Sequence, residues 1–584
     1  MTTRIASLRF RLRPSASAGQ VRATLCVTSA LAFAVLTLAP YAQQDGPLMS
    51  AMADELARSM KELRLKDQPA PYYIEYEVWD RAQTRVTGRL GALMEDLNGR
   101  SRTLRVGVRV GNYDFDSSLF NAPGTNGGGV VSLASDGSIS ATLDDDYDSM
   151  RRQIWLATDA AYKRAVSVFA RKKAAFQNRA AGTEVVPDFS KETPNQSVGT
   201  GLPLQFVNRD WPDRVKQISA VFTGMTAIES SDVQVADTRG TRYFLNSEGF
   251  KVVAPLQIAS VRVTADARAK DGTTLRDTFT LIEKTLQDLP PVSDIQARAK
   301  ALGEHLVALR SAPVAEEYAG PVLVEGEASG ELVTQVLLPP LLARRPPESA
   351  GRGGGRGAAP AQTTPFLRRV GLRVLAEPFS MMDTPSLRTF AGRPVPGSFT
   401  VDDYGIPAKD VTLVEKGRLV TLITGRTPLK GFLQSSGHTR AGDVQPGVIQ
   451  IQSADAVSAS ELKAKYLALL KTQDREFGYI IRSIASPGDV PGGGGGGPVI
   501  LDAVRVTRDG KEQPVRGLRL ATVAAATFKD LLDASKERTM YNFRGTTVDA
   551  VTVIAPSLLF EELEIQQTRE ITQKPPVVGS PLGS

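Results

Sequence analysis

The stretch from Gly320 to Leu342, GPVLVEGEASGELVTQVLLPPLL, decides how the whole chain is interpreted. Its first part contains the short apolar run Val322 to Val324, which is typical of a buried strand. From Glu331 onward, apolar residues recur at helical spacing until Pro339-Pro340, where a regular helix must stop. The pattern therefore predicts a strand that passes directly into a helix.

The junction between them, GEASGE at residues 326–331, resembles the H-E-A-x-G-H motif of the TldD/PmbA metallopeptidase family. In metallated members of that family the two histidines bind the metal, and the glutamate is placed to act as a base. Glu327, Ala328 and Gly330 match the centre of the motif, whereas Gly326 and Glu331 stand at the histidine positions. The simpler alternative is an ordinary strand–turn–helix in which Glu327 is a solvated acid.

The ligand set of a catalytic metal is incomplete in this chain. A catalytic zinc needs about three protein ligands and an open position. Gly326 offers no side chain and Glu331 only one carboxylate, and the cysteine that metallated members carry near the C-terminus is missing, since the sole cysteine is Cys26. We expect no metal cofactor here, although metallated relatives use zinc, and Glu327 is expected to be a vestige of the catalytic base.

Further segments match the family in order, mostly in the second half of the chain. They are Asp383-Thr384-Pro385, GSFTVDDYG at 397–405, VTLVEKGRLVTLIT at 411–424, QSSGHTR at 434–440 and APSLLFEELEI at 555–565. The resemblance covers roughly residues 48 to 565.

Four polar residues in these segments are candidate substrate-binding residues. Asp402 and Asp403 are either paired carboxylates for acid–base chemistry or caps of a turn before a glycine. His438 and Arg440, on a glycine-containing loop, either bind a peptide backbone or carboxylate or brace the loop.

The charge of the chain excludes an electrostatic footprint for nucleic acid. The formal net charge is +7, with 70 basic and 63 acidic residues. Five arginines, at positions 4, 9, 11, 13 and 22, lie in a first segment without acids. Without them the balance is 65 against 63, close to neutral, so a nucleic-acid partner is not expected.

Residues 1–42 resemble a secretory signal peptide. Basic residues come first, and an uncharged apolar run from Ala23 to Ala42 follows. We expect a periplasmic or secreted protein. Pro40 disturbs the possible cleavage sites, and the run is just long enough to span a bilayer, so an uncleaved membrane anchor is the alternative.

The predicted fold class is α+β, with two domains that contain antiparallel sheets and flanking helices. An N-terminal α+β domain is expected at 43–315, a β-rich C-terminal TldD/PmbA-like domain at 316–566, and a flexible tail at 567–584. Glycine-rich loops are expected at 127–129, 344–365 and 487–498.

Several local elements are predicted from spacing and punctuation. Helices are expected at 48–63, at 147–177 behind the acidic run 144–148, at 293–309 with Ser293 as its cap, and at 527–536. A hairpin is expected around Arg239-Gly240, and another around Glu415-Lys416-Gly417. His305 is expected to be a surface or packing residue, because no second metal ligand lies near it in sequence.

The resemblance implies the metal-free PmbA/TldE-like type, which pairs with a TldD-like metallopeptidase that cleaves unfolded or modified peptides. The chain would then dimerise with such a subunit or with itself. Two alternatives stay open: a peptidase in its own right with a rearranged site, and a non-enzymatic envelope scaffold or binding protein. A related chain with an intact H-E-A-x-G-H motif, encoded beside this one, would favour the partner hypothesis over the scaffold.

Overall fold

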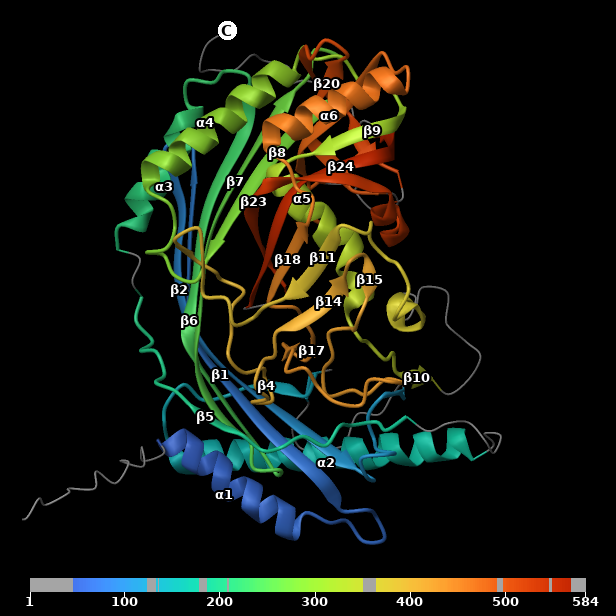
Figure 1. Cartoon of the computed structure of the whole chain (residues 1–584). Coiled ribbons are helices and arrows are strands. Elements are labelled where there is room, and N and C mark those ends of the chain that lie inside the picture. The colour runs from blue at the N-terminus through green and yellow to red at the C-terminus, as the bar shows by residue number, and fades with distance from the viewer. Residues whose placement is uncertain are drawn as a thin grey trace, which may run out of the picture. The chain divides into compact units, whose positions relative to one another are not determined.

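Two large sheets, one from each half of the chain, form the framework of the protein (Figure 1). The computed structural model describes residues 46–122, 133–134, 136–177, 186–206, 209–349, 364–490, 497–521, 523–545 and 549–568. The region predicted as signal peptide lies outside these residues, as do residues 569–584 of the predicted tail, the glycines 127–129, and residues 350–363 and 491–496 of the two later glycine-rich loops. Among the described helices, none is long and apolar enough to cross a membrane.

The first sheet is built from very long antiparallel strands. Its order is β4-β2-β1-β6-β7-β5, with β8 paired to β7. The strands are β1 (Pro71–Arg89), β2 (Ala92–Val110), β4 (Ser138–Ser140), β5 (Gln196–Val198), β6 (Ile228–Asn246), β7 (Lys251–Arg268) and β8 (Thr274–Glu283).

One face of this sheet is apolar and carries the helices. At one end, α1 (Pro47–Glu62) and α2 (Tyr147–Phe176) pack on alternating residues such as Ile74, Tyr76 and Val78. At the other end, α3 (Trp211–Ser219) and α4 (Val292–Leu309) cover a cluster that includes Val86 and Val235. The period-two alternation directs the intervening residues to the opposite face, towards the second half of the chain.

The second sheet closes on itself in part. Its order is β15-β14-β11-β18-β24-β22-β20-β19-β9, with β21 on β20 and β23 on β24. Because β9 also pairs with β24, a five-stranded ring closes around a barrel-like core. The main strands are β9 (Tyr318–Val324), β11 (Phe379–Asp383), β14 (Val411–Glu415), β15 (Arg418–Leu419), β18 (Val448–Ser453), β19 (Phe477–Ile484), β20 (Val499–Thr507), β21 (Glu512–Val515), β22 (Leu518–Leu520), β23 (Leu531–Arg544) and β24 (Ala550–Gln567). Helix α6 (Ala459–Thr472) packs near β9 and β23.

The predicted α+β class is confirmed. Both sheets are mainly antiparallel, although β9–β19, β18–β24 and β5–β7 are parallel pairs. The chain changes sheet between Glu283 and Tyr318, while the described residues from Gly46 onward belong to one compact unit. The division into two domains near residue 315 stays a prediction.

Helix ends follow the sequence signals closely. The acidic run before α2 supplies its cap, because Asp146 accepts a hydrogen bond from Ser149 N at 2.8 Å. A capping box of Ser458 and Glu461 starts α6. Helix α4 differs slightly from the prediction: its N-cap is Pro291, and Ser293 lies inside the first turn.

The hairpin predicted around Arg239-Gly240 is wrong, because β6 runs straight through these residues. Gly240 pairs with Arg81 on one side and Leu256 on the other. A Cβ at Gly240 would lie only 1.9 Å from the Asp80 carbonyl oxygen. This glycine therefore allows two backbones to approach closely and does not mark a turn.

The helix predicted at 527–536 is also wrong. A 3₁₀ turn, Ala525–Asp530, leads into β23, which pairs along β24. Long-range pairing overrides the local pattern here. The hairpin at Glu415-Lys416-Gly417 is confirmed, with Lys416 and Gly417 both at positive φ between β14 and β15.

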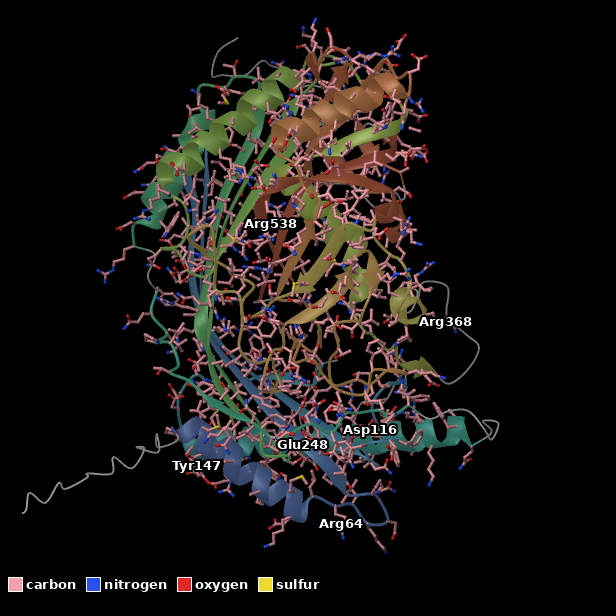
Figure 2. All side chains as sticks on the ribbon, viewed as in Figure 1. Arg64, Asp116, Tyr147, Glu248, Arg368 and Arg538 are labelled. Carbon is pink, nitrogen blue, oxygen red and sulfur yellow. The ribbon has the colours of Figure 1, made fainter. Side chains whose placement is uncertain are left out.

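Buried ion pairs join the two halves. Arg242 of β6 donates to Glu77 at 3.1 Å and to the carbonyl oxygens of Asp402 and Asp403 at 3.1 and 2.8 Å. It also pairs with the Asp403 carboxylate at 3.1 Å. Glu248, labelled in Figure 2, binds Arg426 of the second half at 2.6 Å.

We predict that Arg242→Met lowers the free energy of unfolding by about 3–5 kcal/mol, because buried carboxylates would lose their counter-charge. Denaturant titration measures this. The matched control is Arg89→Met, which breaks an exposed pair with Asp232 on the same sheet and should change the free energy by less than about 1 kcal/mol. Equal effects of the two substitutions would contradict the prediction.

Candidate functional site

The strand predicted within Gly320–Leu342 is confirmed, whereas the helix after it begins at Gly326, before the predicted start at Glu331. Strand β9 is buried between β19 and β24, and α5 (Gly326–Leu332) follows after one residue. A π-helical turn, Val333–Leu337, and a 3₁₀ turn, Pro339–Leu341, complete the segment. Gly326 opens the helix at φ 52°, a conformation that residues with a side chain rarely adopt.

Glu327 projects from the first turn of α5 and is engaged by α4. Arg298 donates to its two carboxylate oxygens at 2.9 and 2.5 Å. The pair is partly accessible, with side-chain exposures of 37% for Arg298 and 44% for Glu327. The predicted vestigial base is therefore held in a bidentate ion pair at the rim of a cavity.

Glu331 is buried and is held by three donors. Gln335 Nε2 donates to Oε1 at 2.6 Å, and Ser486 Oγ donates to Oε2 at 2.9 Å. Tyr541 OH also donates to Oε2. Burial raises the pKa of Glu331 to about 7, against the opposing effect of the Gln335 and Ser486 hydrogen bonds. This carboxyl group therefore titrates near neutral pH.

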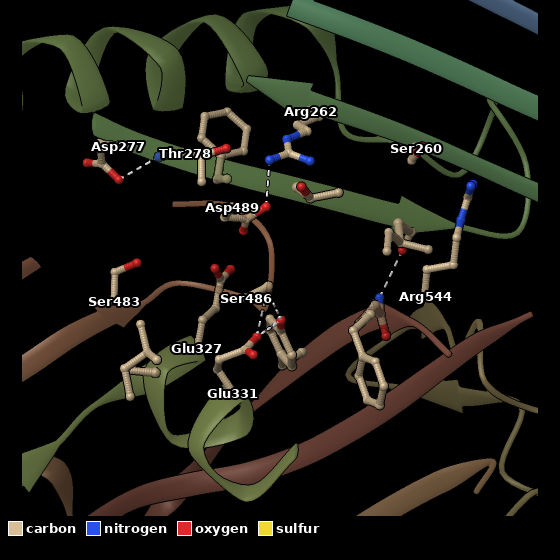
Figure 3. A pocket seen from close by; sticks show the side chains of 18 of the residues that line it. Ser260, Arg262, Asp277, Thr278, Glu327, Glu331, Ser483, Ser486, Asp489 and Arg544 are labelled. Atoms are coloured by element: carbon tan, nitrogen blue, oxygen red, sulfur yellow. Dashed lines mark hydrogen bonds and ion pairs between the residues drawn. The ribbon is translucent and has the colours of Figure 1, made fainter. Parts of the chain in front are cut away.

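These residues line a cavity of about 1010 Å³ between the two sheets. Its first wall is the polar face of β1, β6, β7 and β8. The facing wall consists of α5, residues 483–489 after β19, and the end of β23, while α4 closes one side. Figure 3 shows Glu327, Glu331 and Ser486 together at the α5 side of the cavity, with Asp489 further across it beside Arg262.

His305 lies in this cavity and was not predicted to be part of a site. It bridges two acids, with Nδ1 2.8 Å from Asp277 and Nε2 3.4 Å from Asp502. Burial alone would lower its pKa, but the hydrogen bonds to both acids raise it to about 9. No sequence pattern indicates this arrangement, because the two acids come from β8 and β20, far from His305 along the chain.

Asp402 and Asp403 lie elsewhere and cap a turn. Asp402 Oδ1 accepts from the backbone of Tyr404 and Ile406, each at 3.0 Å, and Oδ2 accepts from Thr439 at 3.1 Å. Asp403 faces Arg242, and burial raises its pKa to about 7 despite that arginine. Neither residue lines the 1010 Å³ cavity.

His438 and Arg440 are likewise buried and brace their loop. His438 contacts the Ser436 carbonyl at 2.9 Å and Asp383 at 3.3 Å. Arg440 donates to the carbonyl oxygens of Pro446 and Ala550. These contacts correspond to the loop-bracing alternative, and their role in substrate binding stays a prediction.

The residues at the family's metal position do not fit a catalytic metal. Gly326 supplies no donor, Glu327 is occupied by Arg298, and Glu331 is held by three protein donors. Among the residues that the structure describes, no group of three or more His, Cys, Asp or Glu side chains is arranged to hold an ion. We therefore assign no metal-dependent step to this chain.

Comparisons with known proteins agree with the class that this element defines, a metallopeptidase-like fold. Residues 317–567 match the family model "PmbA/TldA metallopeptidase C-terminal domain". This C-terminal half of the chain is therefore a domain of the TldD/PmbA family, as its motifs predicted. No curated protein sequence matches it.

Similar solved structures cover nearly the whole chain. They include a suggested modulator of DNA gyrase from Thermotoga maritima, with 13% identity and a TM-score of 0.56 over 88% of this chain and 99% of that one. TldE from Thermococcus kodakarensis has 14% identity and a TM-score of 0.54, with 88% and 99% coverage. A suggested gyrase modulator from Bacteroides thetaiotaomicron has 13% identity and a TM-score of 0.56, over 89% of this chain and 98% of that one. At this identity the likeness shows the fold alone.

We predict that Glu331→Gln removes a pH dependence of stability. Because folding raises this pKa from 4.5 to about 7, the folded state holds its proton more tightly, and the wild-type protein loses stability as pH rises through that window. The free energy of unfolding of the variant should therefore rise relative to that of wild type, by up to about 3 kcal/mol between pH 4.5 and 7. Above pH 7 the difference between the two proteins should stay constant. Denaturant titrations across the whole range test it, and a difference that is constant throughout would contradict it.

Proposed function

We propose that this protein is the exported, metal-free subunit that partners a TldD-like metallopeptidase in the proteolysis of unfolded or modified peptides. One observation carries the proposal: the family's active-site element lines a large cavity, yet its metal positions hold a glycine and a hydrogen-bonded glutamate. The subunit would hold and present the peptide, and its partner would supply the metal.

Two strand edges support a peptide as the ligand. Strand β8 pairs with β7, and residues 541–544 of β23 pair with β24; among the described residues neither has a strand on its other side. Both segments line the cavity, where they meet at a hydrogen bond from Asn542 to the Ile282 carbonyl oxygen. Backbone groups along such edges can hydrogen-bond an extended peptide of any sequence.

We expect the purified protein alone to contain no stoichiometric zinc and to cleave no peptide, and to bind a TldD-like chain that carries H-E-A-x-G-H. Sizing of the mixture and cleavage of an unfolded protein measure both points, with the TldD-like chain alone as control. Faster cleavage by the complex would support the proposal.

A stable monomer without affinity for that chain would contradict it and favour the scaffold alternative. One metal per chain, with activity lost in Glu327→Gln, would show instead a peptidase with a rearranged site.

Export is predicted from the first 42 residues. Fractionation followed by N-terminal sequencing should find the protein outside the cytoplasm, with its N-terminus near Ala42. A cytoplasmic protein that begins at Met1 would refute export, and a membrane-bound one that begins at Met1 would indicate the anchor alternative.

A further inference from the structure

The charges that line the cavity are unevenly neutralised. Three of its cations have acidic partners: Arg262 pairs with Asp489 at 2.5 Å, Arg298 with Glu327, and His305 with Asp277 and Asp502. The other two, Arg85 and Arg544, form no ion pair within the described part of the chain. The cavity therefore holds two arginines whose charge no neighbouring acid compensates.

The register of the first sheet places Arg85 in a row that crosses the cavity wall. Arg85 pairs with Ala236, Ala236 with Ser260, and Ser260 with Ile282, so the four side chains share one face. All four line the cavity. Ala236 and Ser260 are small, which leaves open space beside the Arg85 side chain.

Arg544 reaches the same row from the opposite wall. It is at the end of β23, and Figure 3 shows its side chain pointing across the cavity towards Ser260. Ser260 is two strands from Arg85, about 10 Å at the usual strand spacing. Two long, flexible arginine side chains can converge on one group over that span.

The end of the cavity that holds Arg544 differs from the rest because the acidic side chains lie elsewhere. Figure 3 places Glu327 and Glu331 at the α5 side and Asp489 beside Arg262, all of them away from Arg544. Partial burial lowers the pKa of Arg544, with no acid to offset it. A carboxylate bound here would restore the missing counter-charge and could accept paired hydrogen bonds from a guanidinium.

We propose that Arg85 and Arg544, with Ser260 between them, form a subsite that binds a carboxylate of the peptide ligand. This inference rests on the proposed function, because it deepens the peptide-binding role of the same cavity. It predicts that the subunit prefers peptides that carry a carboxylate and orients them along the cavity with that group away from α5.

The test uses labelled, unstructured decapeptides of neutral side chains and the mature wild-type protein, measured by fluorescence anisotropy. One peptide ends in a free carboxylate, one ends in an amide, and one ends in an amide but carries a single glutamate. We expect a carboxylate-bearing peptide to bind at least about tenfold tighter than the neutral amide, an advantage that should shrink as salt rises. The first and third peptides distinguish a C-terminal carboxylate from an acidic side chain.

The variants Arg85→Gln and Arg544→Gln should each reduce this preference, and the double variant should abolish it without weakening the neutral peptide. Arg89→Gln, an exposed arginine of the same strand that does not line the cavity, is the matched control and should keep the preference. Thermal unfolding of each variant checks that the fold is intact.

Equal binding of all three peptides by wild type and variants would overturn the carboxylate subsite and leave the peptide-handling function standing. If no peptide binds to the protein, either alone or with its TldD-like partner, both the subsite and the proposed function fail.

Discussion

Arg242 brings a positive charge into the space between the two sheets, and the arrangement of the protein depends on its neutralisation there. Its guanidinium meets Glu77 of its own sheet and the Asp402-Asp403 turn of the other half. A buried charge is tolerated only when it is paired and hydrogen-bonded. This contact therefore specifies which turn of the second half faces β6, and so helps to position the second sheet that forms the opposite wall of the cavity.

Within the cavity, the two glutamates of the family's active-site element are engaged by neighbouring protein groups. Glu327 forms an ion pair with Arg298, and Glu331 accepts hydrogen bonds from residues of three different segments. Such a site can hold and orient a ligand, but its carboxylates are engaged by protein groups. Among the described residues, its unpaired charges lie at the other end, on Arg85 and Arg544, where the proposed carboxylate subsite is placed.

Features that depend on neighbours in sequence were predictable. The apolar run Val322 to Val324 and the acidic cap at Asp146 act over a few residues, and both lie where their pattern indicates. Features that depend on distant partners were not. Gly240 resembles a turn residue in the sequence, but in the structure it allows β1 to approach β6 closely. The acidic partners of His305 are recognised only in the fold, where β8 and β20 lie beside α4. The four candidate residues of the family's loops were visible as motifs, but their burial away from the cavity was not; they are Asp402, Asp403, His438 and Arg440.

Close packing between α5 and β23 explains why a glycine is required at position 330 of the motif. A Cβ at this position would lie 2.6 Å from the Cβ of Tyr541, so any larger residue would force α5 and β23 apart. That movement would withdraw the phenol that binds Glu331 and shift the strand that carries Arg544. The glycine is thus kept by packing, whether or not a metal is bound nearby. The centre of the motif therefore records a packing requirement between α5 and β23, and it carries no information about whether positions 326 and 331 bind an ion.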